Sequence, residues 1–170
     1  MVMDRPITLI GFMGSGKSTI GRQIAGAKNR EFKDLDRYIE KITGRSIPDI
    51  FKYLGEDKFR EIESGCLREV LEFPNHVIAL GGGTPCFHNN IKTIKSLSTS
   101  IYLKVSPEGL ASRLLRSPAP RPLIEGKSQE QLTDYIRLEL KKREEFYLQA
   151  DFVIESDQTR FDDLLALVFV

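Results

Sequence analysis

A phosphate-binding pattern, GxxxxGK[ST], occupies residues 11–18 of the chain. It follows the short apolar segment 7–10 and precedes a stretch with apolar residues at helical spacing, which is the strand–loop–helix setting that this pattern requires. Its glycines let backbone N–H groups surround a phosphate, Lys17 neutralises the phosphate oxygens, and Ser18 can hold Mg²⁺. The sequence therefore predicts a site for the phosphates of ATP or GTP.

Two carboxylates, Asp34 and Asp36, lie on either side of Leu35. On an extended segment, residues two apart point to the same side, so both side chains are expected to face one site. One carboxylate could then serve a metal ion and the other an acceptor molecule. The alternative is that Asp36 only caps the N-terminus of the helix that follows.

Two arginines come from different predicted helices. Arg60 and Glu63 are three residues apart and flank an apolar stripe, so they can pair beside a cleft or form an ordinary surface ion pair. Arg143 lies near the middle of another apolar stripe, and Glu139, one turn earlier, is expected to lie off that stripe. Arg143 is therefore expected to bind an anionic ligand, or else to pair with an acid elsewhere in the chain. Two converging arginines suit bidentate binding of a planar carboxylate, which predicts an acidic acceptor.

Two further segments could reach the same site. Three consecutive glycines, residues 81–83, follow the apolar segment 77–80, and bare backbone at the C-terminal end of a strand can approach a ligand, although such a triplet also suits a tight turn. Residues 116–127 contain three prolines and a glycine and are expected to form a loop. From this loop Arg121 could close over the phosphates as part of a lid, or it could remain a solvated arginine.

The elements that must position these residues can be read from the apolar pattern. Strand-like segments alternate with helical stretches along the chain, at residues 7–10, 77–80, 101–103 and 152–154. This alternation predicts a parallel sheet with helices on both faces. Between the first two strands, residues 36–43 are expected to form a helix that stops at Gly44. Ser46 can cap a second helix that ends before Gly55, and a longer helix is expected over residues 56–73.

Length and composition narrow the class of protein. The chain has 170 residues, with 25 Lys plus Arg and 24 Asp plus Glu, so its formal charge is +1. This length predicts one domain, residues 1–170, and near-balanced charge argues against broad attraction to nucleic acid or membrane. The longest apolar run, residues 164–170, is far short of the about 20 residues that span a bilayer and is expected to form a helix face. Cys66 and Cys86 lack metal-ligand spacing and the first residues lack a signal pattern, so free thiols and a cytoplasmic location are expected.

Taken together, these motifs resemble those of the shikimate kinase family. The resemblance rests on residues 11–19, Phe32-Lys33-Asp34-Leu35-Asp36, Ile50-Phe51 with Gly55-Glu56, Phe59-Arg60 with Glu63, Gly81-Gly82-Gly83, Arg121-Pro122-Leu123 and Arg143 with Tyr147. Gluconate kinases and nucleoside monophosphate kinases of related fold do not share this set. The resemblance implies an α/β, three-layer P-loop kinase fold with a five-stranded parallel sheet, a substrate-binding flap over residues 34–60 and a mobile lid over residues 116–127. It also implies transfer of the ATP γ-phosphate to the 3-hydroxyl of shikimate, on the route to chorismate, by a monomer.

The resemblance assigns a role to each matching residue. Catalysis would involve Lys17 on the migrating phosphoryl group, Asp36 on the reacting hydroxyl, and Arg121 in the lid. Ser18 would bind Mg²⁺ directly, and Asp34 would hold the ion through water. Contacts with shikimate would come from Asp36, Arg60, Glu63, Gly81, Gly82, Gly83 and Arg143. Contacts with ATP would come from Gly14, Ser15, Gly16, Lys17, Ser18, Thr19, Arg116 and Arg121.

Two other functions fit part of the sequence. A nucleotide-dependent switch protein would bind nucleotide without a small acidic acceptor, and it would leave Arg60, Asp36 and the glycine triplet without a shared purpose. A kinase for a different polyol acid would act on gluconate or quinate rather than on shikimate. ATP is expected rather than GTP, from the resemblance and because the chain lacks the guanine-reading NKxD motif.

Overall fold

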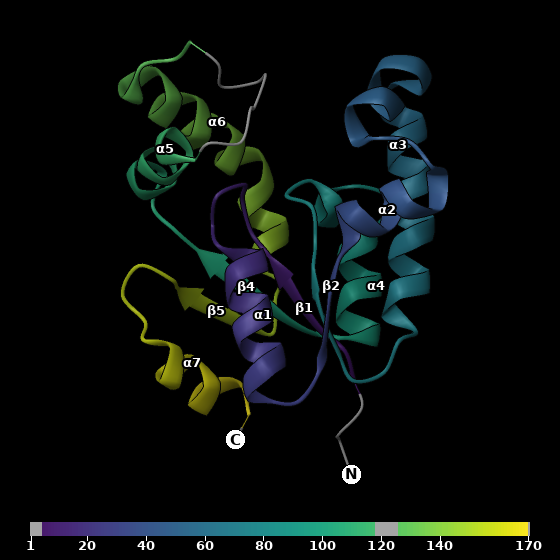
Figure 1. Cartoon of the computed structure of the whole chain (residues 1–170). Coiled ribbons are helices and arrows are strands. Elements are labelled where there is room, and N and C mark those ends of the chain that lie inside the picture. Colours follow the sequence, from purple (N-terminus) through teal and green to yellow (C-terminus); the bar gives the residue numbers. More distant parts are fainter. Residues whose placement is uncertain (1–4, 118–125, 170) are drawn as a thin grey trace.

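Five short segments form one parallel sheet in the computed structural model, which describes residues 5–117 and 126–169. In chain order the strands are β1 (Ile7–Ile10), β2 (Glu31–Asp34), β3 (His76–Ala79), β4 (Thr99–Lys104) and β5 (Phe152–Glu155). Their order across the sheet is β2-β3-β1-β4-β5, and every neighbouring pair runs parallel. Parallel neighbours need crossover connections, which helices supply here (Figure 1).

The connections contain α1 (Lys17–Ala27), α2 (Leu35–Thr43), α3 (Ile47–Leu71), a 3₁₀ turn η1 (Thr84–Cys86), α4 (Asn90–Leu97), α5 (Pro107–Arg116), α6 (Gln129–Tyr147) and α7 (Phe161–Val168). Successive residues of β1 point to opposite faces of the sheet. Leu9 packs in one buried cluster with Ile24 of α1 and Leu164 of α7. Ile10 packs in a second cluster, which contains side chains of α3, α4, α5 and α6. The predicted three-layer α/β architecture is therefore confirmed.

Strand β2 has no counterpart among the segments expected from the apolar pattern, although the family resemblance implied five strands. Its residues, Glu-Phe-Lys-Asp, are mostly charged. It lies at the edge of the sheet, where one of its sides has no neighbouring strand and can face solvent. Asp34 at its end is in register with Ala79 of β3. The chain that follows β2 and the chain that follows β3 therefore leave the sheet side by side.

The predicted flap corresponds to α2 and the first part of α3. Gly44 ends α2 in the left-handed conformation with a φ of 66°, and the Ser46 side chain caps α3 by accepting from the Asp49 N–H at 3.2 Å. Gly55 has non-helical angles, with φ 81° and ψ 170°, and divides α3 where two helices were expected. The predicted helix boundaries are thus confirmed to within two residues.

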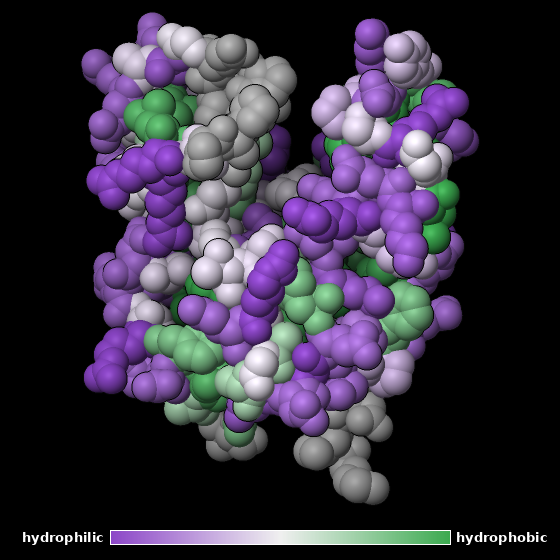
Figure 2. Space-filling model, viewed as in Figure 1, coloured by the Kyte–Doolittle hydropathy of each residue, from purple (hydrophilic) through white to green (hydrophobic). Residues whose placement is uncertain are grey.

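Two pairs of helices stand above the carboxyl ends of the strands, α2 with α3 on one side and α5 with α6 on the other (Figure 1). The surface between them is hollowed, and the side of this cleft formed by α2 and α3 is mostly hydrophilic (Figure 2). The expected C-terminal helix is present as α7. Within residues 5–117 and 126–169, no helix combines the length and the apolar character needed to cross a membrane.

A close approach between α1 and the sheet allows a first test of the packing. A Cβ added at Gly21 would lie 2.5 Å from Phe32 Cε2 and 3.0 Å from Leu9 Cδ1, whereas one added at Gly26 of the same helix would meet nothing within 4 Å. We expect Gly21→Ala to lower the free energy of unfolding by about 1–3 kcal/mol, because the methyl group overpacks the core. Gly26→Ala should leave it unchanged or raise it by up to ~1 kcal/mol, because alanine favours the helix. Urea denaturation measures both changes, and equal changes at the two positions would contradict this packing.

Candidate active site

The phosphate-binding loop, residues 11–16, connects the end of β1 to the first residue of α1. Gly14 and Gly16 have φ angles of 81° and 94°, in the left-handed region that residues with a Cβ rarely adopt. Lys17 follows directly as the first helical residue, so the N–H groups of the helix start lie next to the loop. This is the backbone arrangement that binds phosphate in other proteins.

A cavity of about 310 Å³ opens beside this loop. Its lining consists of Gly14, Gly16, Lys17, Ser18, Thr19, Arg113, Leu114 and Ser117. The Lys17 ammonium donates to the carbonyl oxygens of Gly11 and Phe12, each at 2.8 Å, and is thereby held over the loop. The Ser15 hydroxyl is buried and has no hydrogen-bond partner among the described residues. An unsatisfied polar atom and a fixed ammonium fit a loop that receives an anion.

The oxygen atoms expected to hold a metal ion lie together. Ser18 Oγ donates to Asp34 Oδ2 at 3.0 Å. Such hard oxygen donors suit Mg²⁺, which usually binds one or two protein oxygens together with substrate phosphates. No cluster of three or more His, Cys, Asp or Glu side chains among the described residues could hold a metal ion. Ser18 and Asp34 therefore fit a Mg²⁺ ion that arrives with a nucleotide.

The expected geometry of the two aspartates is wrong in one respect. They do not share one face of an extended segment, because α2 begins at Leu35 and places Asp36 in its first turn. The residue that caps α2 is Asp34, whose Oδ1 accepts the N–H groups of Asp36 and Arg37 at 3.1 and 3.4 Å. The alternative, in which Asp36 is only a helix cap, is therefore also wrong, and Asp36 is left available for chemistry.

Asp36 faces the glycine triplet (residues 81–83). Its Oδ1 lies 3.2 Å from the position that a Cβ on Gly81 would take. The residue is open to the cleft, but its pKa is raised from 3.8 to about 6, mainly because enclosure of the carboxylate by protein removes hydration. The carboxylates of Asp34 and Glu63 contribute to this rise, and Lys17 opposes it. Asp36 is therefore ionised at neutral pH and is a better proton acceptor than an ordinary aspartate.

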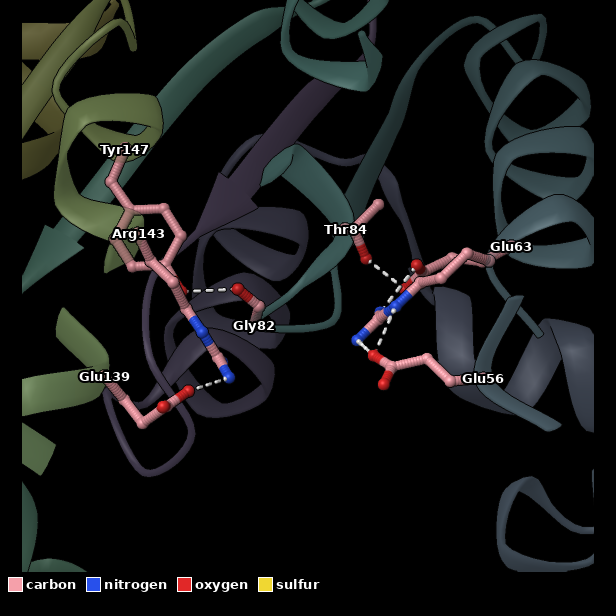
Figure 3. A network of polar contacts seen from close by, with 8 residues as sticks. Glu56, Glu63, Gly82, Thr84, Glu139, Arg143 and Tyr147 are labelled. Carbon is pink, nitrogen blue, oxygen red and sulfur yellow. Dashed lines mark hydrogen bonds and ion pairs between the residues drawn. The ribbon is translucent and has the colours of Figure 1, made fainter. Parts of the chain in front are cut away.

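The Arg60–Glu63 pair is not an ordinary surface pair. Arg60 Nη1 donates to Glu63 Oε2 at 2.9 Å, and Glu63 is only 1% exposed. The other oxygen of Glu63 accepts from Thr84 Oγ1 at 2.6 Å, and Arg60 also bonds Glu56 through Nε and Nη2 at 3.3 and 3.1 Å (Figure 3). Sequence reasoning missed Thr84, because its partner lies 21 residues away. Glu63 thus holds Arg60 in place, and Thr84 in turn holds Glu63.

Arg143 comes from α6 on the opposite side of the cleft. Its Nη2 donates to Glu139 Oε2 at 2.7 Å (Figure 3). The expectation that Glu139 is too far off the stripe to serve Arg143 is therefore wrong: residues four apart are only about 40° apart around a helix, and long side chains close that gap. The guanidinium carbon also lies 5.3 Å from the centre of the Phe12 ring in the phosphate-binding loop.

Both arginines approach the glycine triplet. A Cβ on Gly82 would lie 3.6 Å from Arg143 Nη1, and a Cβ on Gly83 would lie 2.7 Å from Arg60 Nη2. The triplet also makes a turn, since the Thr84 N–H donates to the Gly81 carbonyl at 3.1 Å. The turn is therefore confirmed, and contact of the triplet with a ligand stays a prediction.

Most of the predicted lid, including Arg121, lies outside the described residues. Arg116 is an exposed residue at the end of α5, and its contact with ATP stays a prediction. A polar side chain of α5 that reaches the loop is Arg113, which donates to the Ser15 carbonyl at 3.2 Å and pairs with Asp157 at 2.6 Å. Sequence reasoning overlooked Arg113; the available signal was its place one turn before Arg116 on the helix that leads into the lid.

The fold and the phosphate-binding loop define a P-loop kinase, and two arginines and a carboxylate surround the glycine triplet, an arrangement that suits an acidic acceptor. Comparison with known proteins specifies the family. The model of the shikimate kinase family matches residues 13–168. A shikimate kinase from Parabacteroides distasonis is 41% identical over 152 residues, which are 89% of this chain and 88% of that protein. The chain belongs to the shikimate kinase family.

Solved structures agree with this family. The crystal structure of shikimate kinase from Bacteroides thetaiotaomicron is 36% identical, with a TM-score of 0.93 over 98% of this chain and 99% of that one. The shikimate kinase from Acinetobacter baumannii in complex with shikimate is 34% identical, with a TM-score of 0.83 over 98% of this chain and 91% of that one. The expected P-loop kinase fold is confirmed over almost the whole chain.

The raised pKa of Asp36 predicts that the ionised carboxylate lowers the stability of the fold. Because the folded-state pKa of about 6 exceeds the ordinary 3.8, the ionised carboxylate destabilises the fold above pH 6, and this effect is lost as the pH falls toward 4. Asp36→Asn should therefore raise the free energy of unfolding at about pH 8, by on the order of 1 kcal/mol after allowance for solvent screening. Urea denaturation at about pH 8 and pH 4.5 measures the difference. A gain that does not shrink at the lower pH would contradict this origin.

Proposed function

We propose that this kinase transfers the γ-phosphoryl group of ATP to the 3-hydroxyl of shikimate, and that Arg60 and Arg143 hold the shikimate carboxylate between them. The observation that carries this proposal is the approach of both guanidinium groups, from opposite sides of the cleft, to neighbouring residues of one glycine triplet. Arg60 and Arg143 together are named the carboxylate clamp. A planar carboxylate can accept paired hydrogen bonds from such groups.

With the carboxylate so held, the hydroxyls of the ring would face Asp36 and the phosphate-binding loop. Asp36 would accept the hydrogen bond, and then the proton, of the attacking hydroxyl. Lys17 would stabilise charge on the phosphoryl oxygens, while Arg121 from the lid would add a second cation. Ser18 and Asp34 would hold Mg²⁺, which when bound neutralises phosphate charge. Transfer then depends on positioning and electrostatics.

The ATP-binding residues proposed from the family are Gly14, Ser15, Gly16, Lys17, Ser18, Thr19, Arg116 and Arg121. Gly14, Gly16, Lys17, Ser18 and Thr19 line the cavity beside the loop, which supports this part of the set. The clamp, Asp36 and the loop all come from one chain, which supports activity as a monomer. The free cysteines Cys66 and Cys86 suit the reducing cytoplasm, where we propose that the enzyme acts.

A coupled assay of ADP release tests the proposed function. The enzyme with ATP and Mg²⁺ is given shikimate, the methyl ester of shikimate, gluconate or no acceptor. We expect turnover with shikimate, at least tenfold lower kcat/KM with the ester because its neutral group cannot satisfy the clamp, and no turnover with gluconate. Equal rates with and without an acceptor would instead favour a nucleotide switch, and turnover with gluconate alone would favour another polyol acid.

The clamp itself is tested by a conservative substitution. Arg143→Lys keeps the charge but loses the planar fork, so we expect the KM for shikimate to rise at least tenfold while the KM for ATP changes less than twofold. Arg137→Lys, on the same helix, is the matched control, since Arg137 is 56% exposed and pairs with Glu108 and Asp134. An unchanged KM for shikimate in a folded Arg143→Lys enzyme would remove Arg143 from the clamp.

A further inference from the structure

A buried threonine lies between the glycine triplet and α3. Thr84, the first residue of η1, is fully buried, so its side chain is shut off from the cleft. Its hydroxyl donates to Glu63 Oε1 at 2.6 Å (Figure 3), and its N–H donates to the Gly81 carbonyl at 3.1 Å. One residue therefore connects the acid that holds Arg60 to the backbone of the triplet.

We propose that Thr84 is a positioning residue for the acceptor, whose hydroxyl holds Glu63 and thereby fixes the guanidinium of Arg60 beside Gly83. This inference rests on the proposed function of the clamp. It adds a residue that does not touch the substrate and acts through Arg60, one of the two groups proposed to bind the carboxylate. The hydroxyl keeps Arg60 in the geometry that the ligand requires before the ligand arrives.

The two acids that bond Arg60 differ in burial. Glu56 is 56% exposed, and an exposed ion pair does little to fix the position of a side chain. Glu63 is 1% exposed and accepts from Arg60 Nη1 at 2.9 Å. Because Thr84 bonds the second oxygen of Glu63, the carboxylate cannot rotate without losing a hydrogen bond. Glu63 is therefore the partner that can hold Arg60 in one place.

Thr84 is itself held to α3 from a second direction. Its carbonyl oxygen accepts from Asn90 Nδ2 at 2.9 Å, and Asn90 Oδ1 accepts from Ser64 Oγ at 2.8 Å. Asn90 and Ser64 are both buried, and Ser64 follows Glu63 on α3. Two consecutive residues of α3 therefore hold Thr84, one at its hydroxyl and the other, through Asn90, at its carbonyl. Such a buried hydrogen-bonded network keeps η1 in one position against α3.

Arg60 packs on the same segment of chain. A Cβ on Gly83 would lie 2.7 Å from Arg60 Nη2, and the guanidinium carbon lies 4.1 Å from the centre of the Phe87 ring. Gly83 directly precedes η1 and Phe87 directly follows it. A displacement of Glu63 would therefore move Arg60 relative to the backbone beside which the acceptor is proposed to bind.

A buried threonine in the sheet supplies a matched control. Thr8 on β1 is also fully buried, and its hydroxyl is hydrogen-bonded to Ser98 Oγ at 2.9 Å. This bond joins β1 to the end of α4 and involves neither α3 nor the triplet. A change from threonine to valine at either position replaces one buried hydroxyl by a methyl group of similar size.

The test compares Thr84→Val, Thr84→Ser and Thr8→Val by steady-state kinetics and urea denaturation. We expect Thr84→Val to raise the KM for shikimate about three- to tenfold, with kcat and the KM for ATP within twofold of the wild-type values, because Glu63 loses a donor and no longer fixes Arg60. Thr84→Ser keeps the hydroxyl and should change the KM for shikimate less than twofold. Thr8→Val should also change it less than twofold, even where its loss of stability is as large.

Three results would overturn the inference. The first is an unchanged KM for shikimate in a folded Thr84→Val enzyme. The second is an equal rise of this KM in Thr84→Ser, because the hydroxyl would then not be the cause. The third is an equal rise in Thr8→Val, because the effect would then follow from lost stability alone.

A double-mutant cycle separates this inference from the proposed function. Arg60→Lys alone should raise the KM for shikimate at least tenfold, as expected for a member of the clamp. If Thr84 acts through Arg60, then Thr84→Val adds less than twofold to the KM of the Arg60→Lys enzyme. Independent effects would overturn the inference while leaving the clamp intact. An unchanged KM in a folded Arg60→Lys enzyme would remove Arg60 from the clamp, and the positioning role would fail with it.

A second pair of variants covers the case in which Thr84→Val does not fold. Thr84→Ala and Thr84→Ser both lack the methyl group of threonine, and of the two only serine keeps the hydroxyl. We expect the KM for shikimate of the Thr84→Ala enzyme to be at least threefold higher than that of the Thr84→Ser enzyme. Equal KM values would overturn the inference, because the hydroxyl would then have no part in holding the acceptor.

Discussion

The absence of side chains at residues 81–83 is the constraint on which the rest of the site depends. A Cβ on Gly83 would lie 2.7 Å from Arg60 Nη2 and would displace the guanidinium, and a Cβ on Gly81 would lie 3.2 Å from Asp36 Oδ1. Helices α2, α3 and α6 and the phosphate-binding loop can therefore bring their functional groups to one place. The end of β3, in the middle of a parallel sheet, is where the loops of neighbouring strands converge.

The charged side chains around the glycine triplet nearly balance one another. Burying them costs stability at the site where their chemistry is needed. Glu63 is buried but satisfied, since Arg60 and Thr84 each bond one of its oxygens. Asp36 is enclosed by protein and lies among other carboxylates, and its pKa is raised to about 6, mainly by the loss of hydration. The unfavourable ionisation of Asp36 is thus a property of the site, and the stability that it costs must be supplied by packing elsewhere in the chain.

Local patterns carried most of what the sequence could predict. The phosphate-binding loop is a contiguous motif, and the flap helices are marked by Gly44, Ser46 and Gly55, so each could be recognised from neighbouring residues alone. Strand β2 escaped because its charged residues at a sheet edge lack the apolar signature. Residue type and spacing singled out Asp36, Arg143 and most of the other polar candidates, and the family resemblance then implied a role for each.

Errors arose where a contact depends on side-chain reach or on distant parts of the chain. Asp34 was expected to share an extended face with Asp36, but the helix starts between them. Glu139 was expected to lie too far around α6 to contact Arg143, but the two long side chains span the angle between them. The hydrogen bond from Tyr147 to Gly82 spans 65 residues and has no local signal at all.

The measurement that tests the role of the bare backbone most directly is calorimetric titration of shikimate into the Gly82→Ala enzyme. A Cβ at this position would make only ordinary contacts, 3.5 Å from the Gly11 carbonyl oxygen and 3.6 Å from Arg143 Nη1, so the variant should fold with nearly wild-type stability. The methyl group would nevertheless occupy the space between the clamp and the loop. We expect at least tenfold weaker shikimate binding, with nucleotide binding retained. Unchanged shikimate affinity in the folded variant would contradict it.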